Sequence, residues 1–164
     1  MLVNPFLRKA EKIYQFFIRF GSNFQSLFLL YMRLTWGNEF MHTGIQKLNS
    51  IEKTADFFAS LHISHPFFNA YLVSWTETLC GLCLLLGFAS RMAAIPLIII
   101  MLTALSTAHA PDISNFRFLF DPLSLVRQTP YPFLITAILM LCFGPGRISI
   151  DAWLKRWIGN KPRY

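Results

Sequence analysis

A carboxylate and two thiols interrupt the apolar run SWTETLCGLC at residues 74–83. Cys80 and Cys83 have the spacing of redox pairs, but such pairs usually lie at a helix amino terminus, where the dipole and exposure lower the thiol pKa. Here both thiols fall inside a predicted helix, where β-carbons three residues apart are about 5–6 Å from each other, too far for a disulfide. Small residues also repeat at intervals typical of a helix-packing seam: Thr76, Cys80, Cys83 and Gly87. We therefore expect a packing role for the two thiols, and a redox role stays open.

Two ionisable residues lie deep inside long apolar runs. At 1.5 Å per residue, Arg33 is roughly 10 Å from one end of the first run, and Glu77 roughly 15 Å from either end of the second. A charge inside a membrane span costs at least a few kcal/mol, so such residues normally face other helices and have partners. The sequence therefore predicts an ion pair between Arg33 and Glu77, which is either a structural clamp or part of a site.

A polar stripe follows at helical spacing in the first run: Thr35, Glu39, His42 and Gln46. A carboxylate beside an imidazole can exchange protons near neutral pH, or bind the polar head of an apolar ligand such as a quinone. We predict a cofactor-binding pocket formed by Glu39, His42, Lys47 and His109. The alternative is that Glu39 and His42 only form a hydrogen bond with each other in a water-filled opening of the bundle. The residues that could bind a metal are scattered singly along the chain and form no tight motif, so the sequence does not predict a metal site.

The rest of the chain shows which elements must position these residues. Of its 164 residues, 54% are hydrophobic and only 14% are charged, whereas soluble domains average about a quarter charged. The apolar residues gather into four runs, at residues 26–48, 67–87, 91–109 and 131–143. The first two are long enough to cross a hydrocarbon layer of about 30 Å, and the fourth is short. The sequence thus predicts an all-α integral membrane four-helix bundle.

The basic residues lie at the ends of these runs. The net charge is +7, and the Lys and Arg residues cluster before the first run, between the second and third, and after the fourth. By the positive-inside rule both termini are cytoplasmic, and this distribution argues against a nucleic-acid partner. We predict a cytoplasmic segment at residues 1–25 with a short amphipathic helix, a membrane domain at 26–146 and a basic cytoplasmic tail at 147–164. The long connection at 110–130 predicts a short helix on the outer interface.

Four stretches together resemble the DoxX family of small four-span membrane proteins: RLTWGNEFMHTGIQKL, FFASLHISHPFFNAYLVSWTE, LLLGFASRMAAIPLIIIMLTA and FGPGRISIDAWL. The resemblance rests on a combination of positions: Arg33, Gly37, Gly44, Lys47, Leu48, Glu77, residues 87–96 and residues 144–151. It implies a multi-pass bundle in a bacterial inner membrane. It also implies a role in quinone-reducing systems or beside redox and thiol-protective enzymes, and some relatives accompany systems that make metal-binding peptides. The family assigns no catalytic residue, and its pattern does not include the two cysteines.

The leading functional hypothesis is therefore a quinone-associated or redox-accessory membrane subunit. The sequence has no nucleotide loop, dinucleotide fingerprint or haem attachment motif, so we expect electrons to come from a partner membrane or redox protein, or from a bound cofactor such as a quinone. The alternative is a non-catalytic scaffold or anchor that uses the loop around residues 116–120 and the basic tail, or a small transport helper linked to metal or thiol stress. Gly37 and Gly44 could face another span or another copy, so a homo-oligomer stays open.

Overall fold

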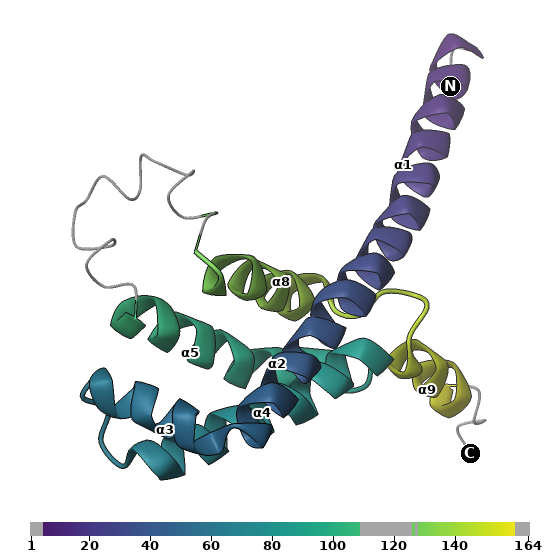
Figure 1. Ribbon diagram of the computed structural model, residues 1–164. Helices are drawn as coiled ribbons and strands as arrows, with labels where there is room; N and C mark the ends of the chain where they lie inside the picture. The colour runs from purple at the N-terminus through teal and green to yellow at the C-terminus, as the bar shows by residue number, and fades with distance from the viewer. Residues whose placement is uncertain (1–4, 109–125, 127, 160–164) are drawn as a thin grey trace.

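The computed structural model describes residues 5–108, 126 and 128–159, and the elements within these ranges are helices (Figure 1). They are α1 (Pro5–Met32), the π-helix η1 (Arg33–Gly37), α2 (Asn38–Asn49), α3 (Ile51–Ser60), α4 (Pro66–Leu86), α5 (Ser90–Ala108), α8 (Pro130–Phe143) and α9 (Ile150–Gly159). The all-α prediction is confirmed. His109 and the predicted helix in the outer loop lie outside the described residues.

The first three elements form one continuous rod, which projects from the bundle at its amino-terminal end (Figure 1). The predicted short amphipathic helix is therefore not a separate element, because α1 runs for 28 residues through the expected boundary at residue 25. A proline is tolerated at the first helical position, as at Pro5. A Cβ atom built on Gly21 would meet nothing within 4 Å, and a glycine at such an open position weakens a helix by only about 1 kcal/mol. The π turn then directs both Arg33 and Gly37 toward the interior, where they are buried.

Glycines bring α2 and α4 into close contact. A Cβ atom built on Gly81 would lie 2.5 Å from the Met41 nitrogen, and one on Gly44 would lie 2.6 Å from the Thr78 nitrogen. Neither position has room for a side chain, so the backbones approach as they do in tightly packed membrane helices. These contacts fix an antiparallel register in which Gly37 lies beside the segment 81–85 and Gly44 beside 74–78. Gly37 and Gly44 therefore face another span of the same chain.

The remaining core lies between α4, α5 and α8. Its fully buried apolar side chains are Leu84, Ala94, Leu97, Ala137 and Met140, and the hydroxyl residues Ser90 and Thr136 are fully buried beside them. By contrast, the outward faces of α4 and α5 carry large apolar side chains such as Leu79 and Leu102, which are more than half exposed. An apolar exterior of this kind fits lipid rather than water as the solvent.

Two described helices are long and apolar enough to cross a membrane, α4 and the segment 90–107 of α5. The helix α8 is apolar but shorter, with 14 residues. A bundle of apolar helices agrees with the predicted membrane fold. The count of four spans and the cytoplasmic placement of both termini stay predictions.

The end of the bundle that carries α9 is locked by side chains from distant segments. The Asp151 carboxylate accepts hydrogen bonds from the backbone nitrogens of Ala89 at 2.8 Å and Ser90 at 3.3 Å. A carboxylate at this place satisfies free N–H groups at the start of α5 and interacts favourably with the helix dipole. The return bond from the Asp151 nitrogen to the Gly87 carbonyl is 3.0 Å long. Together these bonds attach α9 to the turn between α4 and α5.

Candidate functional site

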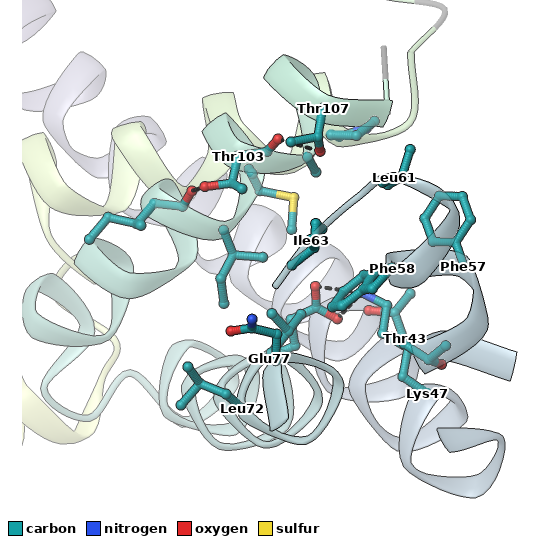
Figure 2. Close-up of a pocket in the computed structure, with 18 of the residues that line it drawn as sticks. Thr43, Lys47, Phe57, Phe58, Leu61, Ile63, Leu72, Glu77, Thr103 and Thr107 are labelled. Carbon is teal, nitrogen blue, oxygen red and sulfur yellow. Dashed lines mark hydrogen bonds and ion pairs between the residues drawn. The ribbon is translucent and has the colours of Figure 1, made fainter. Parts of the chain in front are cut away.

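A cavity of about 670 Å³ lies where α3 covers the helices (Figure 2), at the end of the bundle opposite α9 (Figure 1). Its walls come from α2, α3, α4, α5 and the start of α8. The lining is mostly apolar, with Phe57, Phe58, Ile63, Leu72 and Phe133 among its members. Cavities of roughly 300–1,000 Å³ with apolar walls and a few polar groups are typical of small-molecule sites.

The position of α3 depends on two breaks in the helical path. Ser50 leaves the helical conformation with φ −131° and ψ 50°, so α3 turns away from the axis of α2 and packs against α4. The chain returns through His62 and His65, both left-handed, with φ of 58° and 51°. Histidine is one of the residues enriched in this region. Asn69 then donates a hydrogen bond of 2.6 Å to the Ser64 carbonyl, which holds the return loop against the start of α4.

The cavity wall carries one ion pair, between Lys47 of α2 and Glu77 of α4 (Figure 2). The Lys47 Nζ lies 2.6 Å from each carboxylate oxygen of Glu77. The Glu77 side chain is only 1% exposed, while that of Lys47 is 34% exposed. A carboxylate buried at this depth needs a cationic partner, and Lys47 supplies it. Because the Lys47 side chain is more exposed than that of Glu77, a molecule in the cavity can reach it.

The predicted pair between Arg33 and Glu77 is wrong, because the register of the helices keeps the two residues apart. The glycine contacts place Arg33 beside Gly87, where its guanidinium would meet any added Cβ. Glu77 lies ten residues earlier on α4 (87 − 77), a separation of about 15 Å along a helix. Arg33 instead donates a hydrogen bond of 2.7 Å from Nη1 to the Pro145 carbonyl. It therefore belongs to the junction near α9 and not to the cavity.

The structure separates the other predicted site residues. Of the four residues expected to bind a cofactor, Lys47 lines the cavity, and His109 lies outside the described residues. Glu39 and His42 do not line the cavity and are exposed on the side of α2 turned away from α4. Their binding of a cofactor stays a prediction. In the described ranges, no group of three or more His, Cys, Asp or Glu side chains could hold a metal ion.

Several polar groups of the cavity were not singled out in the sequence. Thr103 and Thr107 of α5 line it, and their hydroxyls donate to the carbonyls of Ile99 at 2.9 Å and of Thr103 at 2.8 Å. Their oxygen lone pairs therefore remain available as acceptors. The helix α3 was also not predicted, because its charged residues place it outside the four apolar runs. Its signal was the helical spacing of the residues that it turns inward, Ile51, Thr54, Ala55 and Phe58.

The two cysteines of α4 lie away from this site. Cys80 and Cys83 are free thiols, half-buried, and pack against the apolar core. Neither lines the cavity. Their surroundings agree with the expected packing role.

Comparison with known proteins gives a consistent family match. The family model described as DoxX matches residues 28–110. A Mycobacterium tuberculosis protein named "Uncharacterized membrane protein Rv3486" is 32% identical over 130 residues, which cover 76% of this chain and 80% of that protein. A Bacillus subtilis protein named "Putative oxidoreductase CatD" is 25% identical over 127 residues, which cover 76% of this chain and 85% of that protein. No solved structure matches. The segment matched by the family model contains both Lys47 and Glu77.

Proposed function

The chain is a membrane protein of the DoxX family, and from that premise we propose that it is a redox-accessory subunit that binds a lipid-soluble quinone. The observation that carries the proposal is the cavity of about 670 Å³, whose lining is mostly apolar and whose polar members are the Lys47–Glu77 pair, Lys53, Asn69 and several threonines. The name of the Bacillus subtilis relative, an oxidoreductase, points to the same class of chemistry.

The chemistry of a quinone matches this lining. Its ring and isoprenoid tail suit the aromatic and aliphatic walls, while its carbonyl oxygens need a hydrogen-bond donor. The Lys47 side chain lines the cavity and is 34% exposed, so its ammonium can donate to such a carbonyl. Both oxygens of the buried Glu77 carboxylate are bonded to Lys47, so the hydroxyl oxygens of Thr103 and Thr107 are the acceptors for the hydroxyl of the reduced form. Reduction to the quinol takes up two electrons, which a partner redox protein supplies, and two protons, which come from water.

The proposal places the chain in the inner membrane of a bacterium, as a multi-pass protein. The antiparallel helices α4 and α5, joined by the turn at residues 87–89, support at least two crossings. The basic residues at the α9 end favour that end as the cytoplasmic one. The cavity then lies in the outer half of the membrane, where a quinone can enter from the lipid.

A cavity-filling variant tests the proposal. Ala104 lines the cavity, so Ala104→Trp is expected to block it and to weaken binding of a short-chain quinone by about tenfold or more. Leu102→Trp, on the lipid-exposed face of the same helix, is the matched control and should bind as the wild type does. Binding is measured with purified protein in nanodiscs by calorimetric titration.

Equal affinity in Ala104→Trp and Leu102→Trp would contradict a site in this cavity. If the wild type binds no quinone but still co-purifies with partner proteins from membranes, the scaffold or anchor function replaces the proposal.

A further inference from the structure

The helix α9 begins at the level where two apolar helices end. The span in α4 ends at Leu86 and the span in α5 begins at Ser90. The Asp151 carboxylate accepts bonds from the backbone nitrogens of Ala89 and Ser90, and the Asp151 nitrogen donates to the Gly87 carbonyl. Figure 1 shows α9 at this end of the bundle. The first turn of α9 is therefore held at the edge of the hydrocarbon layer.

The length of α9 limits where it can go from that edge. Its 10 residues, Ile150–Gly159, form a helix about 15 Å long, which is half of a hydrocarbon layer of about 30 Å. A helix of this length cannot cross the membrane. It either lies along the membrane surface or projects into the water, and its side chains distinguish these two arrangements.

One side of α9 carries large apolar side chains that are exposed. Trp153 and Trp157 are 63% and 62% exposed, and Ile150 is exposed as well. Their spacing of three and four residues places them on the same side of the helix. Tryptophan is enriched where a membrane meets water, because its ring is apolar and its N–H group is polar. This side of α9 is therefore suited to the membrane interface and not to bulk water.

The lipid around the bundle reaches this side of α9. Phe88 and Met92 flank the two residues whose nitrogens bond to Asp151, and both are large, apolar and exposed. The apolar exterior of α4 and α5 thus continues to the start of α9. The same solvent that covers these two helices covers the apolar side of α9.

The charges at this end suit anionic lipids. Residues 87–91 and 144–159 contain four basic residues and one carboxylate, namely Arg91, Arg147, Lys155, Arg156 and Asp151. The carboxylate is already bonded to backbone nitrogens, so the exposed charge is positive. Basic residues beside a membrane attract the phosphates of anionic phospholipids.

The basic residues of α9 differ in their position around the helix. Successive residues are about 100° apart, so Arg156 lies at the border of the side that carries Trp153 and Trp157. Its long side chain can lie along the apolar surface and place the guanidinium among the phosphates. Lys155 is about 200° from Trp153 by the same geometry, so it points away from the membrane.

We propose that α9 is an anchor in the headgroup layer of the membrane. Trp153 and Trp157 lie against the upper part of the acyl chains, and Arg156 binds the phosphate of an anionic phospholipid. Because Asp151 attaches α9 to the turn between α4 and α5, the anchor fixes the depth of both helices. The cavity lies at the other end of the bundle, so the anchor does not depend on quinone binding.

Spin labels on opposite sides of α9 test its position. A nitroxide is attached to Trp153→Cys or to Lys155→Cys, in a variant whose Cys80, Cys83 and Cys142 are replaced by alanine. The purified protein is placed in nanodiscs of phosphatidylglycerol and phosphatidylcholine in equal parts. The label at 153 should collide with oxygen, which concentrates in the membrane, and should be protected from a water-soluble nickel chelate. The label at 155 should show the reverse.

Two results would overturn the anchor. Equal access of the nickel chelate to both labels would show that α9 projects into the water. A label at 153 that is protected from both oxygen and the chelate would show that protein, and not lipid, covers the apolar side.

Removal of one charge tests the phospholipid contact. Native mass spectrometry of protein released from the same nanodiscs counts the lipids that stay bound, and the wild type should retain phosphatidylglycerol in preference to phosphatidylcholine. Arg156→Gln should lower this preference about fivefold. Lys155→Gln, which removes the same charge from the opposite side, is the matched control and should lower it by less than about twofold. No preference in the wild type, no loss in Arg156→Gln, or equal losses in both variants would refute the contact.

Discussion

Lys47 places its ammonium 2.6 Å from both carboxylate oxygens of Glu77, at the wall of the cavity. This pair has two separable roles, since it neutralises a buried carboxylate and also presents polar groups to a ligand. Replacing one partner of a buried pair leaves an uncompensated charge, whereas replacing both by apolar residues is often close to neutral for stability. Variants at these positions can therefore separate stability from binding.

Lys47→Met should destabilise the protein by on the order of 3 kcal/mol, because Glu77 remains buried without its partner. Lys47→Met combined with Glu77→Leu should recover most of that loss, yet bind quinone weakly, since the polar wall is gone. Thermal unfolding in detergent measures the first effect, and titration in nanodiscs the second. Lys53→Met, an exposed residue of the same cavity, is the control for loss of a positive charge. A double variant that binds quinone with wild-type affinity would show that the pair has only a structural role.

At the scale of the elements, the seam between α2 and α4 determines which charged residues lie close together. The helices approach because Gly37, Gly44 and Gly81 have no side chains. That approach brings Lys47 to Glu77 and Arg33 to the α9 end. The glycines thus determine which charged residues meet.

Gly81→Ala should destabilise the bundle by about 1–3 kcal/mol, because its Cβ would lie 2.5 Å from the Met41 nitrogen and must push the helices apart. Gly21→Ala is the matched control, since nothing lies near that position. It should be neutral or stabilising by up to about 1 kcal/mol, as expected in an exposed helix. Thermal unfolding measures both. Equal effects of the two substitutions would show that α2 and α4 are not in close contact.

A second prediction concerns the attachment of α9. Asp151→Ala removes the acceptor for the Ala89 and Ser90 nitrogens, at a cost of about 1 kcal/mol by analogy with lost helix caps. Hydrogen exchange at these two amides should accelerate, while exchange within α3 should not change. Asp56→Ala, exposed on α3, is the control. Unchanged protection of residues 89 and 90 in Asp151→Ala would contradict the contact.

The sequence predicted the helical class and the apolar runs, and it singled out Arg33, Lys47 and Glu77 individually. It did not predict which of them meet, because depth estimated from the ends of a run ignores the π turn at 33–37 and the offset set by the glycines. The cavity depends on α3 folding back over α4, a tertiary contact that periodicity alone does not show. Glu39 and His42 were identified as a polar stripe, and only packing revealed that the stripe faces outward.

At the scale of the whole molecule, the two ends of the bundle differ. The α9 end is closed by Arg33 and Asp151, whose side chains bond to backbone of distant segments. The opposite end holds the cavity, with α3 over it. Because hydrogen bonds hold the α9 end together and the cavity lies at the α3 end, the bundle is suited to admit a ligand at the α3 end only.

The orientation follows from the distribution of charge and is directly testable. Lys155→Cys on α9 should react with an impermeant maleimide only in inside-out vesicles, because the positive-inside rule predicts that the basic end is cytoplasmic. Lys53→Cys on α3 should react in intact spheroplasts. Both residues are exposed, so access to the reagent is not limited by burial. Both substitutions are made in a variant whose three cysteines, Cys80, Cys83 and Cys142, are replaced by alanine. Labelling of both from the same side would contradict the predicted topology.

The measurement that tests the central claim most directly is photo-labelling with an azido-quinone, followed by mass spectrometry of the modified peptides. The cavity predicts adducts on α3 and α5, near Phe57, Phe58 and Thr103, which disappear with excess unlabelled quinone and in Ala104→Trp. Adducts confined to lipid-facing positions such as Leu79 and Met92, unaffected by competitor, would contradict a quinone site in the cavity.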